Sequence, residues 1–316
     1  MTISMTERLR VALLRTEYAD VYGKDIVSMF NEWLSDASLE IGKQLEIVEF
    51  NAVRGPLPSL EEILGFDGVV IPGSLSSAYD GDEWISNLSE LIRRMVRSRV
   101  RMVGVCFGHQ IIARALGGSV VANPKGLHLR LSSFEPNLGA YPSGLFNTSG
   151  EEAEAVKLHF SHNDVVVSLP SPAEGLPEGV SVASLGGSPM CPVQGLCLSE
   201  EGEGGGRVFG VTLQGHPEYA TPTGQGCLRG VIDAFCKDRA EVPKLMEEVG
   251  RPCSTQMLAV AAIRVLAGFC LEEPERGDSI KGKGKELVRD QSQQQEKGCV
   301  QSDGISVGGQ QTGLQV

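Results

Sequence analysis

Short apolar runs alternate with longer segments of helical periodicity in the first part of the chain, and few folds accommodate this order. The runs are rich in Val, Ile and Leu and lie at 11–14, 45–50, 68–72 and 101–105. The longer segments repeat apolar residues with helical spacing, at 25–40, 84–96 and 107–116. Strands that alternate with helices form a mainly parallel sheet covered by helices on both faces. We therefore expect an open α/β fold of this kind.

The second half of the chain has a different pattern. Strand-like runs separated by Pro and Gly follow one another without intervening helices, at 165–169, 180–183, 193–198 and 208–213. Consecutive strands joined by short loops pair antiparallel. We therefore expect a small antiparallel section, with a flexible hairpin loop at 200–206 and a helix at about 224–237.

The composition changes near residue 274, which indicates a domain boundary. Residues 274–316 contain no aromatic residue and are rich in Gln and Gly. Such a segment cannot bury enough apolar surface to offset its chain entropy. We expect one domain over 1–250, a C-terminal helix within 251–273, and a disordered tail over 274–316.

The charge balance excludes several classes of partner. The formal net charge is −12, so the chain is repelled by the phosphates of nucleic acids and anionic membranes. No apolar stretch is long enough to cross a membrane, and the N-terminus lacks a secretory signal pattern. We expect a cytoplasmic protein that binds neither nucleic acid nor membrane.

The chain has eight cysteines but no CxxC pair, which disfavours a zinc site or a redox dithiol. In a cytoplasmic protein these cysteines are expected to be reduced. The sequence indicates no metal site and no cofactor, and we expect neither. A single reactive thiol is compatible with a protein whose cysteines are reduced.

The most distinctive local feature is Gly104-Val-Cys106-Phe-Gly108, between an expected strand and an expected helix. A nucleophile flanked by glycines at such a junction is typical of a nucleophile elbow, whose tight turn lifts the central side chain above the sheet. The helix N-terminus favours the thiolate of Cys106, and the N–H of Phe107 is suited to stabilise an oxyanion. A buried core thiol remains the alternative, because free cysteines are commonly buried.

Two further loops directly follow expected strands. His216 and Glu218 are two residues apart in Gly215-His-Pro-Glu218, so in extended backbone both side chains lie on one face. A carboxylate beside an imidazole orients the base of a catalytic triad. Gly73, in Pro72-Gly-Ser74, is placed to bring a backbone N–H to a reacting carbonyl. Alone, each loop is better explained as an ordinary turn, but together they predict convergence on Cys106, with Gly73 and Phe107 as oxyanion donors.

Four motifs in register resemble class I glutamine amidotransferases, over roughly residues 10–240. They are Cys106-Phe-Gly-His-Gln110, Ser161-His-Asn-Asp164 followed by Leu169-Pro170, Pro192-Val-Gln194, and Gly215-His-Pro-Glu218. With its Gly73-Ser-Leu-Ser-Ser-Ala-Tyr-Asp80 segment, the chain is most similar to stand-alone relatives of the GMP synthase amidotransferase domain, which are common in fungi. The resemblance implies a flavodoxin-like class I glutamine amidotransferase fold.

The resemblance also implies a Cys-His-Glu triad. Cys106 attacks the carboxamide of glutamine and forms a γ-glutamyl thioester. His216, oriented by Glu218, transfers a proton to the departing ammonia and then activates water. The expected small-molecule partner is therefore glutamine or another γ-glutamyl compound.

The motifs further imply residues that hold the substrate. Gln110 matches a position that helps to hold it, and Ser161 and His162 match a loop near its amino-acid end. His109 and His128 match no functional position, and we interpret them as structural.

Three functions remain open. The chain is a glutaminase that passes ammonia to a separate synthetase, or a stand-alone γ-glutamyl peptidase that cleaves glutathione-type peptides or conjugates, as similar plant enzymes do, or a non-catalytic binding or regulatory relative. The intact triad favours the first two, which share one acyl-enzyme chemistry and differ in the leaving amine. Residues 241–316 contain no phosphate-binding loop, so we expect any ammonia-accepting synthetase to be a separate protein.

Overall fold

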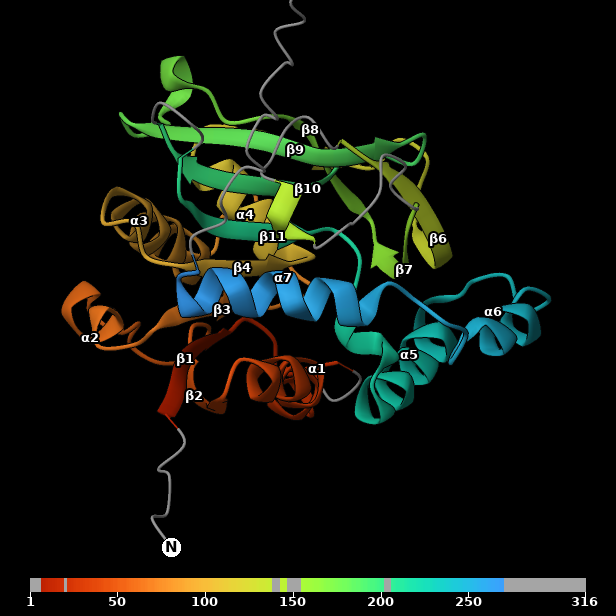
Figure 1. The fold of residues 1–316 in the computed structure, drawn as a ribbon. Coiled ribbons are helices and arrows are strands. Elements are labelled where there is room, and N and C mark those ends of the chain that lie inside the picture. Colours follow the sequence, from red (N-terminus) through yellow and green to blue (C-terminus); the bar gives the residue numbers. More distant parts are fainter. Residues whose placement is uncertain (1–6, 20–21, 138–142, 147–154, 202–205, 270–316) are drawn as a thin grey trace, which may run out of the picture. The chain divides into compact units, whose positions relative to one another are not determined.

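The computed structural model describes residues 7–269 except 20–21, 138–142, 147–154 and 202–205, all within the unit Met1–Arg276. Nine strands form one sheet in the order β2-β1-β3-β4-β11-β10-β9-β6-β7, and β5 pairs with β8 separately (Figure 1). The strands from β2 to β11 in this order run parallel, whereas β10, β9, β6 and β7 pair antiparallel. The sheet therefore has a parallel half and an antiparallel half.

The parallel half contains the strands that carry the candidate site. They are β1 (Glu7–Arg15), β2 (Lys43–Asn51), β3 (Gly68–Ile71), β4 (Met102–Val105) and β11 (Val208–Leu213). The central strands β3, β4 and β11 are buried along their whole length. Their continuous apolar sequences fit this position, because strands covered on both faces expose no polar side.

Helices cover both faces of the parallel half. On one face lie α1 (Ile26–Glu40), α5 (Pro222–Phe235) and α7 (Thr255–Ala267), and Figure 1 shows α7 crossing the parallel strands. On the other face lie α2 (Leu60–Leu64), α3 (Glu83–Arg97) and α4 (Phe107–Ala115). Alternate residues of β1 reach the two cores: Val11 and Leu13 contact the first group, Ala12 and Leu14 the second.

The antiparallel half extends the same sheet beyond β11. It contains β10 (Cys191–Glu200), β9 (Val180–Ser188), β6 (His128–Pro136) and β7 (Val156–His162), and the separate pair is β5 (Ser119–Ala122) with β8 (Asp164–Ser168). The remaining elements are α6 (Val242–Glu248) and the single turns Ser143–Leu145, Pro172–Glu174 and Pro217–Ala220.

The expected fold class, a mainly parallel α/β sheet with helices on both faces and an antiparallel section, is confirmed. The sequence analysis did not anticipate β5, β6, β7 or α6. The centre of the loop at 200–206 and the whole tail at 274–316 lie outside the described residues. Within the described part of the chain, no helix combines the length and apolar character that crossing a membrane requires.

Gly108, in the first turn of α4, lies so close to β3 that an added Cβ would be 1.9 Å from the carbonyl oxygen of Ile71. We expect Gly108→Ala to lower the free energy of unfolding by about 2–4 kcal/mol, because backbone must move to relieve the contact. Gly226→Ala, in α5, is the control: its added Cβ meets no atom within 4 Å. It should raise the free energy of unfolding by about 0.5–1 kcal/mol. Chemical denaturation measures both, and equal effects would contradict this account.

Candidate active site

Cys106 forms the tight turn between β4 and α4, with φ +53° and ψ −107°. Such backbone at a residue other than glycine costs on the order of 1–3 kcal/mol and persists only where the surroundings fix it. Two hydrogen bonds do so here. The N–H of Cys106 donates to the carbonyl of Leu213 at 2.8 Å, and the N–H of Gly108 donates to the carbonyl of Pro72 at 3.0 Å. The turn therefore has the geometry of the elbow expected from the sequence.

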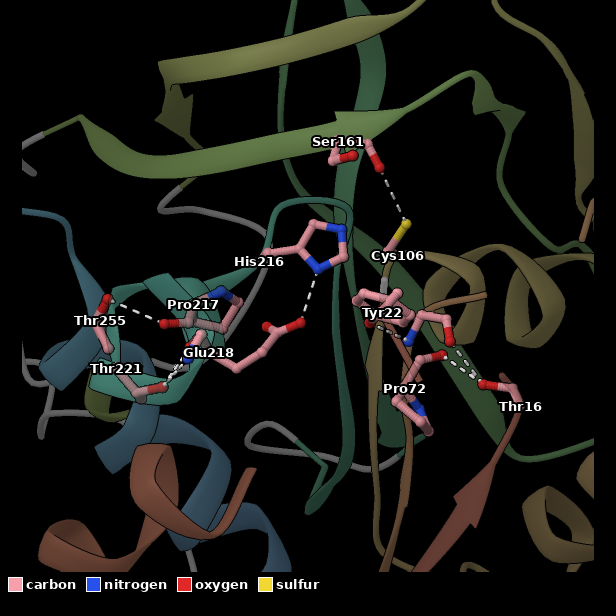
Figure 2. A network of polar contacts seen from close by, with 12 residues as sticks. Thr16, Tyr22, Pro72, Cys106, Ser161, His216, Pro217, Glu218, Thr221 and Thr255 are labelled. Carbon is pink, nitrogen blue, oxygen red and sulfur yellow. Dashed lines mark hydrogen bonds and ion pairs between the residues drawn. The ribbon is translucent and has the colours of Figure 1, made fainter. Parts of the chain in front are cut away.

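His216 follows β11, the parallel neighbour of β4, so the two strands end at the same edge of the sheet. The N–H of His216 donates to the carbonyl of His159 at 2.8 Å, which ties this loop to β7. Figure 2 shows the imidazole of His216 beside the sulfur of Cys106. Residues 110 positions apart in the sequence thus lie together.

Glu218 accepts a hydrogen bond on Oε1 from Nδ1 of His216 at 2.7 Å, and both side chains are buried. The contact was expected, but the reason given for it was wrong. Residues Pro217–Ala220 form a single 3-10 turn and not extended backbone. Thr221 closes this turn, because both its N–H and its hydroxyl donate to the carbonyl of Glu218.

The pKa of His216 is raised to about 10. Burial by itself lowers this pKa, but the Glu218 carboxylate and the Cys106 sulfur favour the charged imidazole and together outweigh burial. The ring stacks on Tyr219 with centroids 4.3 Å apart. Nε2 has no oxygen or nitrogen partner in the described part of the chain, so this atom is free to act on Cys106 or on a substrate.

Cys106 is 5% exposed and borders a cavity of about 230 Å³. It donates weakly to the carbonyl of Ser161, with Sγ and O 3.8 Å apart. Gln110, His162 and Asp164 also line this cavity. A smaller cavity on the side of His216 shares Cys106 and Ser161 with it. The candidate nucleophile is therefore accessible to a small molecule.

The two expected oxyanion donors differ in their surroundings. The N–H of Gly73 donates to the hydroxyl of Tyr22 at 3.0 Å, and a Cβ at Gly73 would lie 2.3 Å from that oxygen. Because glycine has no Cβ, the Tyr22 hydroxyl can approach this position. An oxyanion role for Gly73 stays a prediction. The next residue, Ser74, borders both cavities. Phe107 begins α4 and buries its ring against Trp84, and its oxyanion role likewise stays a prediction.

The expected substrate-binding residues all lie in the wall of the cavity. The side-chain amide of Gln110 donates to the carbonyl of Asp164 and to Oε1 of Gln214, both at 3.1 Å. His162 contacts the carbonyl of Asp164 through Nδ1 at 2.9 Å. Ser161 turns its carbonyl toward the thiol, as Figure 2 shows. Their contacts with a substrate stay predictions.

The other histidines near the site are held neutral by burial. Burial lowers the pKa of His109 to about 3 and that of His128 to about 4. His109 lies between the hydroxyl of Thr212 and the carbonyl of Val193. His128 pairs with His162, whose pKa burial and this neighbour lower to about 3. These contacts are consistent with structural roles for His109 and His128.

The sequence analysis missed several polar groups at the site. Asp164 lines the cavity and accepts hydrogen bonds from the hydroxyls of Ser77 at 2.6 Å and Tyr79 at 2.9 Å. All three belong to segments on which the family resemblance rests. The sequence therefore pointed to these residues, but it did not show that they contact one another. Tyr22, which bonds Gly73 and lies edge-on to the His216 ring, had no sequence signal.

A larger groove, of about 650 Å³, lies between residues 52–59 and 82–94, and neither Cys nor His lines it. The described residues contain no cluster of three or more His, Cys, Asp or Glu side chains suited to hold a metal ion.

The sequence pattern of the family described as "Glutamine amidotransferase class-I" matches residues 23–232, and the chain belongs to this family. The matched region includes the elbow, the loop after β11 and most of the sheet.

Proteins that are similar to this chain are named for different activities. Gamma-glutamyl peptidase 5 of Arabidopsis thaliana is 30% identical over 217 residues, which are 68% of this chain and 78% of that protein. A GMP synthase of Alcanivorax borkumensis is 26% identical over 221 residues, 68% of this chain and 37% of that protein. A crystal structure of a glutamine amidotransferase from Thermotoga maritima has a TM-score of 0.56 at 18% identity, covering 82% of this chain and 99% of that one. This last likeness concerns the fold alone.

Removing the charge of Glu218 should make the thiol of Cys106 less reactive at low pH. The carboxylate raises the pKa of His216, and a charged imidazole stabilises a neighbouring thiolate. We expect Glu218→Gln to slow alkylation of Cys106 by iodoacetamide at least about tenfold at pH 6, with the rates converging above pH 9. Peptide-resolved mass spectrometry separates Cys106 from the other thiols.

Glu32→Gln is the control for this measurement. Glu32 also accepts hydrogen bonds, but from the backbone N–H and the hydroxyl of Thr223, at an exposed position away from the cavity. Its alkylation profile should match that of the unchanged protein. If Glu218→Gln also left the profile unchanged, the carboxylate would not control the charge of His216.

Proposed function

We propose that this protein hydrolyses γ-glutamyl amides through a covalent thioester on Cys106. The observation that carries the proposal is the buried His216–Glu218 pair beside an elbow thiol that borders a cavity. Family membership supports it, because the matched region contains all three side chains. The first substrate we propose is glutamine, with ammonia as the leaving group.

Acylation begins from a thiolate on Cys106 and a protonated His216. The sulfur attacks the carbonyl carbon of the γ-amide and forms the S–C bond, while the carbonyl electrons move onto oxygen. The backbone N–H groups of Gly73 and Phe107 are the proposed donors to that oxyanion. Collapse of the intermediate breaks the C–N bond, and His216 gives its proton to the leaving nitrogen. Ammonia and a γ-glutamyl thioester result.

Deacylation uses the same groups in reverse order. His216, now neutral, removes a proton from water, which attacks the thioester carbonyl. The S–C bond then breaks, glutamate leaves, and the thiolate–imidazolium pair is restored. Glu218 accepts the hydrogen bond from Nδ1 of His216 and so holds the ring with Nε2 available to the reacting groups.

A second leaving amine is tested alongside ammonia, because one relative supports it. One protein that is 30% identical to this chain is named a gamma-glutamyl peptidase. The chemistry above is unchanged when the leaving nitrogen belongs to an amino acid or peptide instead of ammonia. Glutaminase activity that supplies a separate synthetase and peptidase activity on glutathione-type substrates are therefore two forms of one proposal.

The test offers the purified protein glutamine, glutathione and a glutathione conjugate in parallel and measures released ammonia and glutamate. Ammonia from glutamine identifies the glutaminase form, and glutamate from the peptides identifies the peptidase form. Cys106→Ala should lower turnover at least about 1,000-fold, whereas Cys253→Ala, at a half-buried thiol remote from the cavity, should not. Full turnover by Cys106→Ala would refute the mechanism.

A further inference from the structure

Large apolar side chains gather at the mouth of the cavity that holds Cys106. Leu75, Leu127 and Phe235 all line it, and they are 53%, 42% and 38% exposed. They come from three separate segments: the loop after β3, the turn before β6, and the last residue of α5. We call these three side chains the apolar rim. Exposed side chains of this size usually mark a binding surface when they cluster around a concave site.

One part of the apolar rim continues toward the candidate base. Val231 and Phe235 are four residues apart in α5 and therefore share one face of the helix. Val231 is buried and borders the smaller cavity together with His216, whereas Phe235 borders the larger cavity. Leu75 borders both. An apolar strip thus runs from His216 to the solvent.

The position of His216 determines which part of a substrate meets this strip. His216 protonates the leaving nitrogen, so the leaving group must lie on its side of Cys106. The glutamyl part carries an ammonium and a carboxylate, which need polar partners. Polar groups for these charges lie in the wall of the larger cavity: Asp164 and Ser77 line it, and Asp164 accepts hydrogen bonds from the hydroxyls of Ser77 and Tyr79. The leaving group is the part of the substrate that an apolar surface can accommodate.

The charges of the residues that line the cavity further restrict which leaving groups can bind. Among the described residues that line the larger cavity there is neither Lys nor Arg, and Asp164 is the one acidic side chain. His162 is neutral, because burial holds its pKa at about 3. A leaving group with its own carboxylate finds no cation here, and the net charge of −12 adds to its repulsion.

We infer that the leaving-group subsite prefers an uncharged amine that carries an apolar substituent, and that Leu75, Leu127 and Phe235 determine this preference. The inference rests on the proposed function and specifies its substrate class. The preferred substrates are γ-glutamyl amides of apolar amines, ahead of glutamine and ahead of γ-glutamyl peptides that end in a carboxylate.

A matched substrate series tests the preference. The probes are glutamine, γ-glutamyl ethylamide, γ-glutamyl benzylamide and γ-glutamyl phenylalanine, and the readout is kcat/KM for glutamate release. We expect the benzylamide to exceed glutamine at least about tenfold, with the ethylamide between them. The phenylalanine peptide has the same ring plus a carboxylate and should fall at least about threefold below the benzylamide. Equal values across the series would overturn the inference.

Variants of the apolar rim show whether these residues cause the preference. Leu127→Ser and Phe235→Ser should each lower the ratio of kcat/KM for the benzylamide to kcat/KM for glutamine about tenfold. Leu64→Ser and Phe269→Ser are the controls, since both side chains are exposed and neither lines the cavity. Their values should match those of the unchanged protein for every substrate.

The remaining outcomes separate this inference from the proposed function. If glutamine is hydrolysed but the rim variants change all substrates equally, the subsite inference fails and the proposed function stands. If no γ-glutamyl amide is hydrolysed, both fail. If the rim variants change the mass of the protein in solution and not the substrate ratios, the rim joins two copies of the chain and the subsite inference fails.

Discussion

The pairing of β4 with β11 is the constraint on which the site depends. Because the two strands are parallel neighbours, their carboxyl ends deliver Cys106 and His216 to one edge of the sheet. The hydrogen bond from the Cys106 N–H to the Leu213 carbonyl extends this pairing by one residue into the elbow itself. The register of one strand pair therefore brings the two side chains together.

Two buried histidines show how a nearby carboxylate changes the pKa of an imidazole. His109 and His216 are both fully enclosed, yet burial lowers the pKa of His109 to about 3, whereas His216 reaches about 10 despite its burial. The difference is the charge of Glu218 and of the neighbouring sulfur, since His109 has only neutral partners. A buried imidazole is thus held charged where a carboxylate accepts its Nδ1 hydrogen, and it is held neutral where its partners are uncharged.

The sequence predicted the parallel half and the elbow at Cys106 because both rest on local patterns. Apolar runs reveal fully buried strands, and glycines flanking Cys106 reveal the elbow. Strands β6 and β7 were missed because exposed positions interrupt their apolar pattern. The 3-10 turn at His216 was missed for a related reason: two residues can meet by several backbone paths, and spacing alone does not choose among them. Tyr22 reaches Gly73 through tertiary packing alone.

The backbone conformation of Cys106 affects which residue at position 106 would be favoured in a screen for stability. Its φ of +53° suits glycine, which adopts such a turn without steric penalty. Glycine at position 106 would therefore relax the elbow while removing the sulfur. The residue that best serves folding and the residue that serves chemistry differ at this one position, so screening for thermal tolerance alone would favour loss of the thiol.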